Sequence, residues 1–337
     1  MLADRPIYLL TNMSQPSYIE LYHSGILNKR AEALKQRLLN CDICPRKCGV
    51  NRMESNKGFC RSGRLVSISS YCDHHGEEPA LSGSRGSGTI FFTSCNLKCT
   101  YCQNYQISQG TDTSKAELEY HELGDIMLHL QNTLRCHNIN LVSPSHWVPQ
   151  IVQAVLYAIP HGLKIPLVYN TNAYDSIETL KLLDGIIDIY LPDIKYASDK
   201  WASQFSGAKN YVSTCRKAIS EMFRQAGNLI TDDKGLAQRG LIVRHLILPN
   251  DIAGSTDSLK WLAKNVSRDT TISIMAQYFP SHLAIHESLL SRKITREEYD
   301  RVISLLDELG LENGWLQEMD SAGFYLPDFD NKRHPFK

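Results

Sequence analysis

The sequence predicts an α/β protein built on a partial (β/α)6 barrel, with a metal-binding segment before the barrel and a helical segment after it. Two observations predict this class. From about residue 88 onward, six short runs rich in β-branched and aromatic residues alternate with amphipathic stretches. Seven of the ten cysteines form two groups, within residues 41–60 and 95–102.

The six predicted strands are residues 88–93, 138–143, 165–171, 186–192, 241–248 and 271–278. The helices predicted between them are residues 123–134, 148–158, 176–184, 210–226 and 255–266. Strands separated by helices are expected to run parallel, because a parallel neighbour needs a long crossover connection. The predicted core is therefore a six-stranded parallel sheet curved into a partial barrel.

Three regions follow from this pattern. Residues 1–87 form an N-terminal cysteine-rich, metal-binding appendage, residues 88–280 the barrel, and residues 281–337 a C-terminal helical extension. In the extension, Thr295 and Glu298 have the spacing of a capping box, and apolar residues follow at helical spacing up to Leu309.

Composition narrows the class of function. The chain has 337 residues, of which 42% are hydrophobic, too many for a disordered protein. Its 36 basic and 36 acidic residues balance, which argues against a general nucleic-acid binder. No apolar run is long enough for a membrane span, and Asp4 and Arg5 interrupt any signal peptide. We therefore expect a soluble, cytoplasmic protein with no membrane or nucleic-acid partner.

In a reducing compartment, clustered cysteines indicate metal ligation in preference to disulfides. Cys95, Cys99 and Cys102 follow the first predicted strand directly, with C-x3-C-x2-C spacing. Three such thiolates suit an iron–sulfur cluster and leave one iron without a cysteine ligand. An open coordination position is where a substrate binds, and the C-terminal ends of barrel strands are where active sites lie.

These residues resemble a known signature. The segment CNLKCTYC at residues 95–102 is similar to the C-x3-C-x-aromatic-C motif of the radical S-adenosylmethionine (SAM) superfamily. Over residues 38–280 the chain is most similar to pyruvate formate-lyase activating enzymes, especially relatives with an N-terminal four-cysteine segment. The resemblance implies a radical SAM barrel and a 4Fe–4S cluster whose open iron binds SAM. It also implies oxidoreductase chemistry, in which SAM is cleaved reductively to a 5'-deoxyadenosyl radical that abstracts hydrogen.

The resemblance also implies a set of SAM-binding residues at the ends of strands. Tyr101, between two of the cysteines, corresponds to the aromatic residue beside the adenine. Polar residues end the third and fourth predicted strands, where relatives bind ribose, a monovalent cation or the SAM carboxylate; these are Asn170, Thr171, Asn172, Asp193 and Lys195.

Two further pairs are candidates for cofactor binding. Arg244 and His245 lie within the fifth strand run and are expected to face the barrel interior, with the alternative that one of them faces a helix. Where relatives carry Gly-Gly-Glu for the SAM amino group, this chain has Ser143-Pro144-Ser145-His146. Ser143 or Ser145 is the candidate for that role, through a hydroxyl or a carbonyl oxygen.

The first cysteine group is Cys41, Cys44, Cys48 and Cys60. Four thiolates close a tetrahedral shell, which predicts either structural zinc or an auxiliary iron–sulfur cluster. The spacing does not choose between these two, and four independent free thiols are the alternative. The nearby residues 72–79 (CDHHGEEP) are interpreted as a loop shaping the entrance to the cluster, with a mononuclear metal site as the other possibility.

Three functions remain open. The first is hydrogen abstraction from a backbone glycine of a glycyl-radical enzyme, with a flavodoxin or a ferredoxin as electron donor. The second keeps the radical chemistry but acts on a small molecule or another peptide. The third is a non-catalytic metal-binding or electron-transfer protein, which the missing fourth cysteine and the polar strand ends argue against. The sequence identifies neither the substrate nor a residue that performs the chemistry on it.

Overall fold

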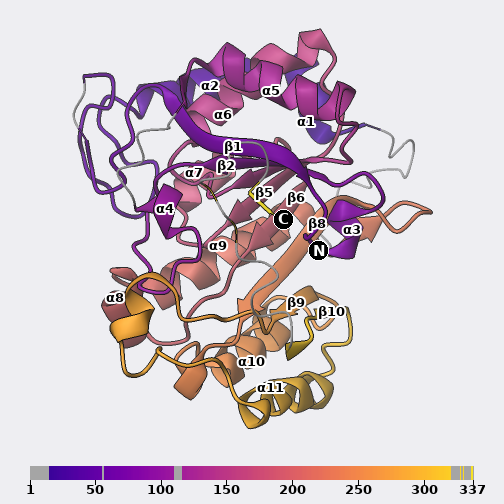
Figure 1. Cartoon of the computed structure of the whole chain (residues 1–337). Helices are drawn as coiled ribbons and strands as arrows, with labels where there is room; N and C mark the ends of the chain where they lie inside the picture. Colours follow the sequence, from indigo (N-terminus) through magenta and orange to yellow (C-terminus); the bar gives the residue numbers. More distant parts are fainter. Residues whose placement is uncertain are drawn as a thin grey trace, which may run out of the picture.

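In a computed structural model, the described part of the chain forms a ten-stranded sheet with helices packed against it (Figure 1). The structure describes residues 15–54, 57–109 and 116–319, together with Pro327, Phe329 and residues 335–336. Within these residues, no helix combines the length and the apolar character that a membrane crossing requires.

The strands are β1 (Val66–His74), β2 (Ser87–Phe92), β3 (Ala116–Leu118), β4 (Ile139–Val142), β5 (Leu167–Thr171), β6 (Ile189–Pro192), β7 (Ile230–Thr231), β8 (Ala237–Leu246), β9 (Thr271–Met275) and β10 (Gly314–Leu316). The helices are α1 (Ser17–His23), α2 (Ile26–Gln36), α3 (Pro79–Ser82), α4 (Tyr105–Ser108), α5 (Tyr120–Asn132), α6 (Val148–Ala158), α7 (Ile177–Leu182), α8 (Asp199–Ser206), α9 (Tyr211–Ala226), α10 (Ser255–Asn265) and α11 (Arg296–Leu309).

The predicted α/β class and its six strands are confirmed. Strands β2, β4, β5, β6, β8 and β9 lie side by side in that order, and every neighbouring pair among them is parallel. Helices connect them as expected, and α6 has the predicted bounds. Among the described residues the outer strands β3 and β10 do not pair with each other, so the sheet stays open.

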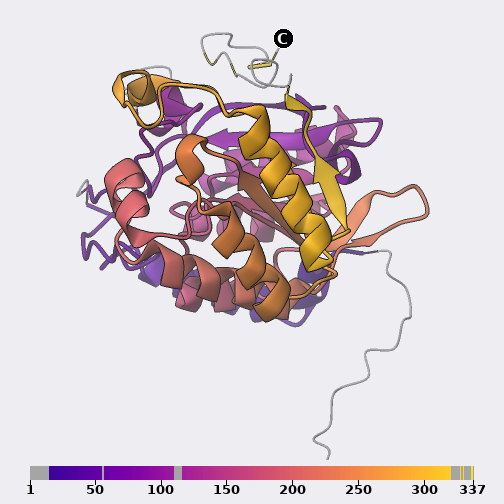
Figure 2. The ribbon, with the colours of Figure 1, turned by 90° about the horizontal axis from the view of Figure 1, so that it is seen from below.

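The sheet extends beyond the predicted barrel at both edges. Strand β1, which lies in the segment predicted as an appendage, pairs antiparallel with β2, and β3 pairs antiparallel with β1. At the other edge, β10 comes from the predicted helical extension and pairs parallel with β9 (Figure 2). The sequence signal for both strands is weak, because β1 includes two consecutive serines and β10 is only three residues long.

A layer of helices covers one side of the sheet. Helix α6 (VPQIVQAVLYA) has eight buried residues and contacts both α2 and α5, with which it is grouped in Figure 1. A helix that is apolar on most of its circumference has to be enclosed by other elements. Helix α11 begins with the predicted capping box, in which Thr295 and Glu298 bond reciprocally to each other's backbone N–H.

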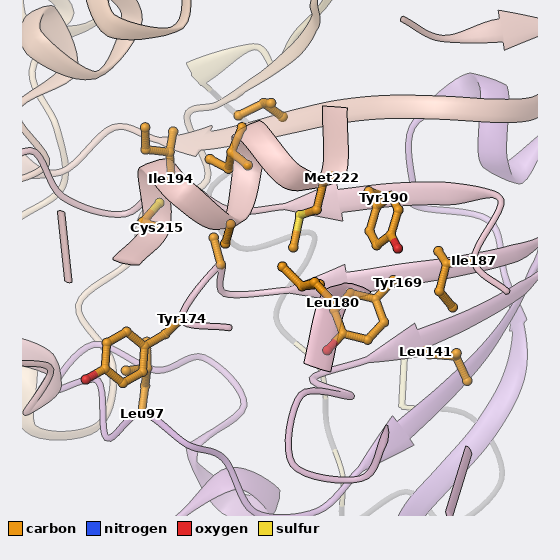
Figure 3. Packing of buried hydrophobic residues seen from close by; sticks show 14 of the residues in the cluster. Leu97, Leu141, Tyr169, Tyr174, Leu180, Ile187, Tyr190, Ile194, Cys215 and Met222 are labelled. Carbon is orange, nitrogen blue, oxygen red and sulfur yellow. The ribbon is translucent and has the colours of Figure 1, made fainter. Parts of the chain in front are cut away.

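Alternate residues of the parallel strands pack on opposite faces. Tyr169 of β5 and Tyr190 of β6 belong to the large core between sheet and helices, where they lie with Leu180 (Figure 3). Their neighbours Val168 and Ile189 belong instead to a smaller apolar cluster inside the curved sheet. Helix α3 closes this cluster, which consists of Ala80, Leu81, Val168, Ile189, Leu191, Ala237 and Ile242.

Candidate active site

A cavity of ≈ 870 Å³ is bordered by the carboxyl ends of the parallel strands. Cys95, Cys99 and Cys102 lie in the loop that follows β2, and all three line this cavity. No fourth cysteine lines it among the described residues. The structure therefore brings the C-x3-C-x2-C thiols to the edge where parallel sheets place their ligands.

Each of the three sulfurs has polar neighbours. The Cys95 sulfur accepts hydrogen bonds from the backbone N–H of Leu97 at 3.3 Å and from Asn172 Nδ2 at 3.4 Å. Ser206 Oγ donates to the Cys99 sulfur at 3.0 Å. The Cys102 sulfur lies 3.2 Å from the hydroxyl of Ser108. Donors of this kind stabilise a sulfur that carries negative charge.

Burial works in the opposite direction on the same thiols. It raises the pKa of Cys95 to about 12 and that of Cys102 to about 11, and the charge of Cys99 adds to both shifts. Thiols in such surroundings ionise only when a strong positive centre is beside them. The three thiols are thus not poised as free nucleophiles.

The donor set of three thiols fits an iron–sulfur cluster. Among the described residues, no three His, Cys, Asp or Glu side chains are gathered to hold one metal ion. The Cys95, Cys99 and Cys102 thiols instead border an open space, and sulfur-only ligation is typical of iron–sulfur clusters. The hydrogen bonds from Leu97 and Ser206 are of the kind that tune such clusters.

Most of the predicted SAM-binding residues line the same cavity as the cysteines. They come from the loop after β2 and from the ends of β4, β5, β6 and β8, and they are Tyr101, Ser143, Asn170, Thr171, Asn172, Asp193, Lys195 and Arg244. Tyr101 is buried and makes edge-to-face contacts with the rings of Tyr196 and Tyr278, which fix its orientation.

Lys195 and Asp193 form a partly buried ion pair just beyond β6. Lys195 Nζ lies 2.6 Å from Asp193 Oδ2, and their side chains are 18% and 21% exposed. Burial favours the neutral amine, but the attraction of Asp193 and then of Cys99 outweighs it and raises the pKa of Lys195. Lys195 is therefore a permanent cation within electrostatic reach of the three thiols.

Arg244 and His245 face opposite ways, as neighbours on a strand must. Arg244 lines the cavity, whereas His245 does not. His245 is fully buried, with Nδ1 2.9 Å from the carbonyl of Ile194 and Nε2 2.8 Å from Ser255 Oγ at the start of α10. The expectation that both face the interior is thus corrected: Arg244 does and His245 faces a helix.

In the segment at residues 143–146, which replaces Gly-Gly-Glu, one of the two candidate serines lines the cavity and the other does not. Ser143 lines the cavity with a backbone φ of 59°, in the left-handed region. Ser145 does not line it: the residue is 2% exposed, and its hydroxyl lies 3.0 Å from Thr171 Oγ1. His146 is also buried, and burial lowers its pKa to about 3.

The segment at residues 72–79, interpreted from sequence as a loop at the cluster entrance, does line the cavity, although its first three residues belong to β1; the charged cluster that it forms with Arg244 was not predicted. Glu77 and Glu78, which follow β1, both bind the guanidinium of Arg244, with Glu78 Oε1 at 2.7 Å from Nε. His74 Nδ1 donates to Glu77 at 3.0 Å. Burial opposes the charge of Glu77, but Arg244 and His74 lower its pKa to about 2. Only the adjacent glutamates before Pro79 hinted at this cluster.

The first cysteine group lies in a separate pocket. All four sulfur-bearing residues, Cys41, Cys44, Cys48 and Cys60, line it. Burial raises the pKa of Cys44 to about 12, and the other three cysteines add to the shift, so Cys44 lies within electrostatic reach of each of them. The choice between zinc and an iron–sulfur cluster stays a prediction.

Close packing shapes this second pocket. Phe59 N–H donates to the Cys48 sulfur at 3.4 Å. A Cβ at Gly58 would lie 2.8 Å from the Cβ of Cys48, so only glycine permits this approach. The pocket wall is thus built around the thiols.

Comparison with known proteins gives one relative in sequence. No family model matches the chain. The chain is 29% identical over 302 residues to an uncharacterized protein of Methanocaldococcus jannaschii, MJ0674, across 87% of this chain and 82% of that protein.

Solved structures give more distant likenesses. Those found include HydG, a maturase of the FeFe-hydrogenase, with 13% sequence identity and a TM-score of 0.45. Methylornithine synthase PylB has 13% sequence identity and a TM-score of 0.41. A third is TYW1 with a lysine–pyruvate adduct bound (12%, 0.39). They match 66%, 64% and 69% of this chain, and 48%, 59% and 77% of their own. The chain thus spans about half the length of HydG. Likenesses of this degree say nothing about activity, which has to come from the residues of this chain.

Proposed function

We propose that this chain is a radical SAM enzyme that cleaves SAM reductively. The observation that carries the proposal is the juxtaposition of Cys95, Cys99 and Cys102 with polar strand ends around one large cavity. When bound, a 4Fe–4S cluster on these thiolates would supply one electron to the sulfonium of SAM, giving methionine and a 5'-deoxyadenosyl radical. The cavity volume falls within the range of about 300–1,000 Å³ that small-molecule sites occupy.

The residues of the chain have defined parts in this proposal. Lys195, held in its charged form by Asp193, is positioned to bind the carboxylate of SAM through a charge-assisted hydrogen bond. The rigid ring of Tyr101 provides an apolar surface for the adenine. Ser143 is the candidate acceptor for the SAM ammonium, and Asn170 and Asn172 offer amides to the ribose.

Formation of 5'-deoxyadenosine tests the proposal. The full-length protein, reconstituted anaerobically with iron and sulfide and then reduced, is expected to produce it from SAM. Cys99→Ser should abolish the product, because one of three cluster ligands is lost. Cys215→Ala is the matched control, since Cys215 is buried away from the cavity and should retain activity. Equal activity in Cys99→Ser would contradict the proposal.

We further propose a backbone glycine of a glycyl-radical enzyme as the position of hydrogen abstraction, with a flavodoxin or a ferredoxin as electron donor in the cytoplasm. The similarity of residues 95–104 to activating enzymes supports this choice. The test is a glycine-centred radical signal when a candidate glycyl-radical protein is added to the reduced enzyme with SAM. Absence of that signal with every candidate from the same organism would contradict it.

A small molecule is the second candidate substrate. The buried cluster of Glu77, Glu78 and Arg244 favours it, because fixed charges in a cavity wall orient a small polar ligand. This candidate predicts that a small polar metabolite accelerates 5'-deoxyadenosine formation while no protein radical appears.

A further inference from the structure

The pocket of the first cysteine group contains one residue from a distant part of the chain. His146 lines it together with Cys41, Cys44, Cys48 and Cys60. His146 follows β4 and is separated from these cysteines by more than eighty residues of sequence. The loop after β4 therefore contributes an imidazole to a pocket whose other lining residues all come from the N-terminal segment.

The two ring nitrogens of His146 have different surroundings. Nε2 lies 3.1 Å from the backbone carbonyl of Thr93. Since a carbonyl oxygen only accepts, Nε2 carries the hydrogen and donates it. Nδ1 is buried and has no hydrogen-bond partner among the described residues. In the neutral ring, Nδ1 is then an acceptor whose lone pair receives no hydrogen bond from the described residues. Because the residue is only 1% exposed, bulk solvent does not reach this atom freely.

We propose that His146 Nδ1 is a ligand of a metal centre in this pocket, which gives the centre mixed sulfur and nitrogen ligation. Metal-binding histidines almost always donate their second ring N–H to a carboxylate or a backbone carbonyl, which fixes the tautomer and the ring orientation. The bond from Nε2 to Thr93 is a contact of that kind. Thiolate and imidazole ligands suit both zinc and iron.

A second unpartnered group supports an anionic centre. Arg46 lines the same pocket, and its Nη2 is buried without a hydrogen-bond partner among the described residues. Its other nitrogens are engaged, with Nε 2.9 Å from the carbonyl of Asn96 and Nη1 2.6 Å from that of Gly207. A guanidinium held this way offers one N–H to thiolate sulfur and balances its charge.

The five candidate ligands border the pocket without forming a closed shell for one ion among the described residues, and a centre of four protein ligands that includes His146 leaves one of the four thiols uncoordinated. Metal binding is therefore expected to draw the coordinating side chains inwards by rotation. The site is independent of the proposed SAM cleavage, because none of its ligands lines the large cavity.

The test uses the full-length chain with Cys95, Cys99 and Cys102 all changed to alanine, so that only this pocket offers clustered thiols. One sample is reconstituted with iron and sulfide and then reduced by dithionite, so that a cluster becomes paramagnetic, and another is loaded with Co²⁺ as a spectroscopic probe for zinc. Both are made with 15N-labelled histidine and with unlabelled histidine, and pulsed electron paramagnetic resonance measures nitrogen coupling. We expect an imidazole coupling that changes with the label, in whichever sample binds one centre per chain.

His146→Gln isolates the ligating atom, because a glutamine amide can still donate to Thr93 while Nδ1 is removed. The imidazole coupling should disappear and metal affinity should fall at least tenfold. His146→Cys should recover affinity without the coupling, which separates ligation from misfolding. His161→Gln, a change of an exposed histidine, should alter neither.

Three results would overturn the inference. The first is a metal centre without imidazole coupling in the chain that retains His146. The second is a coupling that persists in His146→Gln. The third is the absence of bound metal in both samples, which would leave Nδ1 as the partner of a water molecule only.

Discussion

The ion pair of Lys195 and Asp193 is the sharpest electrostatic feature beside the cysteines. A lysine with three donors and one carboxylate partner retains donors for a second carboxylate. Because the pair is mostly buried, solvent screens such a contact less than it would at the surface. Lys195 is therefore the residue at which SAM binding is expected to respond most directly to a single change.

Lys195→Ala is expected to weaken SAM binding by about 10- to 100-fold, since a hydrogen bond to a charged group is worth about 1.5–3 kcal/mol. Cluster assembly should be unaffected, because no cysteine is changed. Titration of SAM against the reconstituted variant measures the effect, and Lys217→Ala, an exposed change in α9, is the control. An affinity equal to that of the unchanged protein would place the pair outside the SAM site.

The single positive charge of Arg244 balances one of the two negative charges of the buried carboxylates Glu77 and Glu78. Arg244→Ala leaves Glu77 and Glu78 buried without a guanidinium, and loss of one member of a buried ion pair costs about 3–5 kcal/mol. We expect a clear fall in the free energy of unfolding, measured by urea denaturation. Arg296→Ala is the matched control: its pair with Asp300 is exposed and screened by solvent, so the change should lower the free energy of unfolding far less than Arg244→Ala does. Equal losses in the two variants would refute this account of Arg244.

The same cluster predicts a dependence of stability on pH. Glu77 has a folded-state pKa of about 2, below an unfolded value of about 4.3. Its contribution is therefore present above the unfolded pKa and is lost as the pH falls from about 5 towards 2. As the pH falls across this range, the melting temperature of Arg244→Ala should fall less steeply than that of the unchanged protein. The reason is that Arg244 contributes most to lowering the pKa of Glu77. Parallel curves for the two proteins would contradict this origin.

At the scale of elements, the N-terminal segment brings its four cysteines to one pocket beside the sheet. It is anchored by buried contacts: Arg52 Nη1 donates to the carbonyl of His146 at 2.7 Å, and Arg46 binds the loop that carries Cys95. A metal in this pocket would join segments that the chain order keeps apart. Structural metal sites contribute folding energy directly.

Replacing Cys41 and Cys44 together by serine is expected to lower the metal content by one site and to lower the melting temperature. The centre on Cys95, Cys99 and Cys102 should keep its spectrum, because its ligands come from a different loop. Metal analysis with calorimetry measures both effects, and the analysis also distinguishes zinc from iron. An unchanged metal count together with an unchanged melting curve would refute a metal in this pocket.

Elements with a strong local pattern were predictable. Helix α6 is apolar on most faces, and α11 carries its own capping box, so both could be read from a few residues of sequence. Strands β1 and β10 were not, because their pairing with β2 and β9 depends on partners elsewhere in the chain. Short edge strands are specified by the sheet they join more than by their own residues.

At the scale of the whole molecule, the candidate active site lies where the carboxyl ends of the parallel strands meet at one edge of the sheet. Residues such as Asn170 and Asp193 could be predicted because each ends a parallel strand, and parallel strands end at one edge. The contact of Glu78 with Arg244 could not, since it joins residues 166 positions apart whose only local signal is their charge. The orientation of His245 likewise depended on the exact register of β8.

The central claim is that Cys95, Cys99 and Cys102 hold an iron–sulfur cluster to which SAM binds. The most direct measurement is the electron paramagnetic resonance spectrum of the reduced, anaerobically reconstituted protein before and after SAM is added. The account predicts a 4Fe–4S signal that changes with SAM, and the loss of that iron and of the response when all three cysteines are changed to alanine. A triple variant with the iron content and SAM response of the unchanged protein would contradict it.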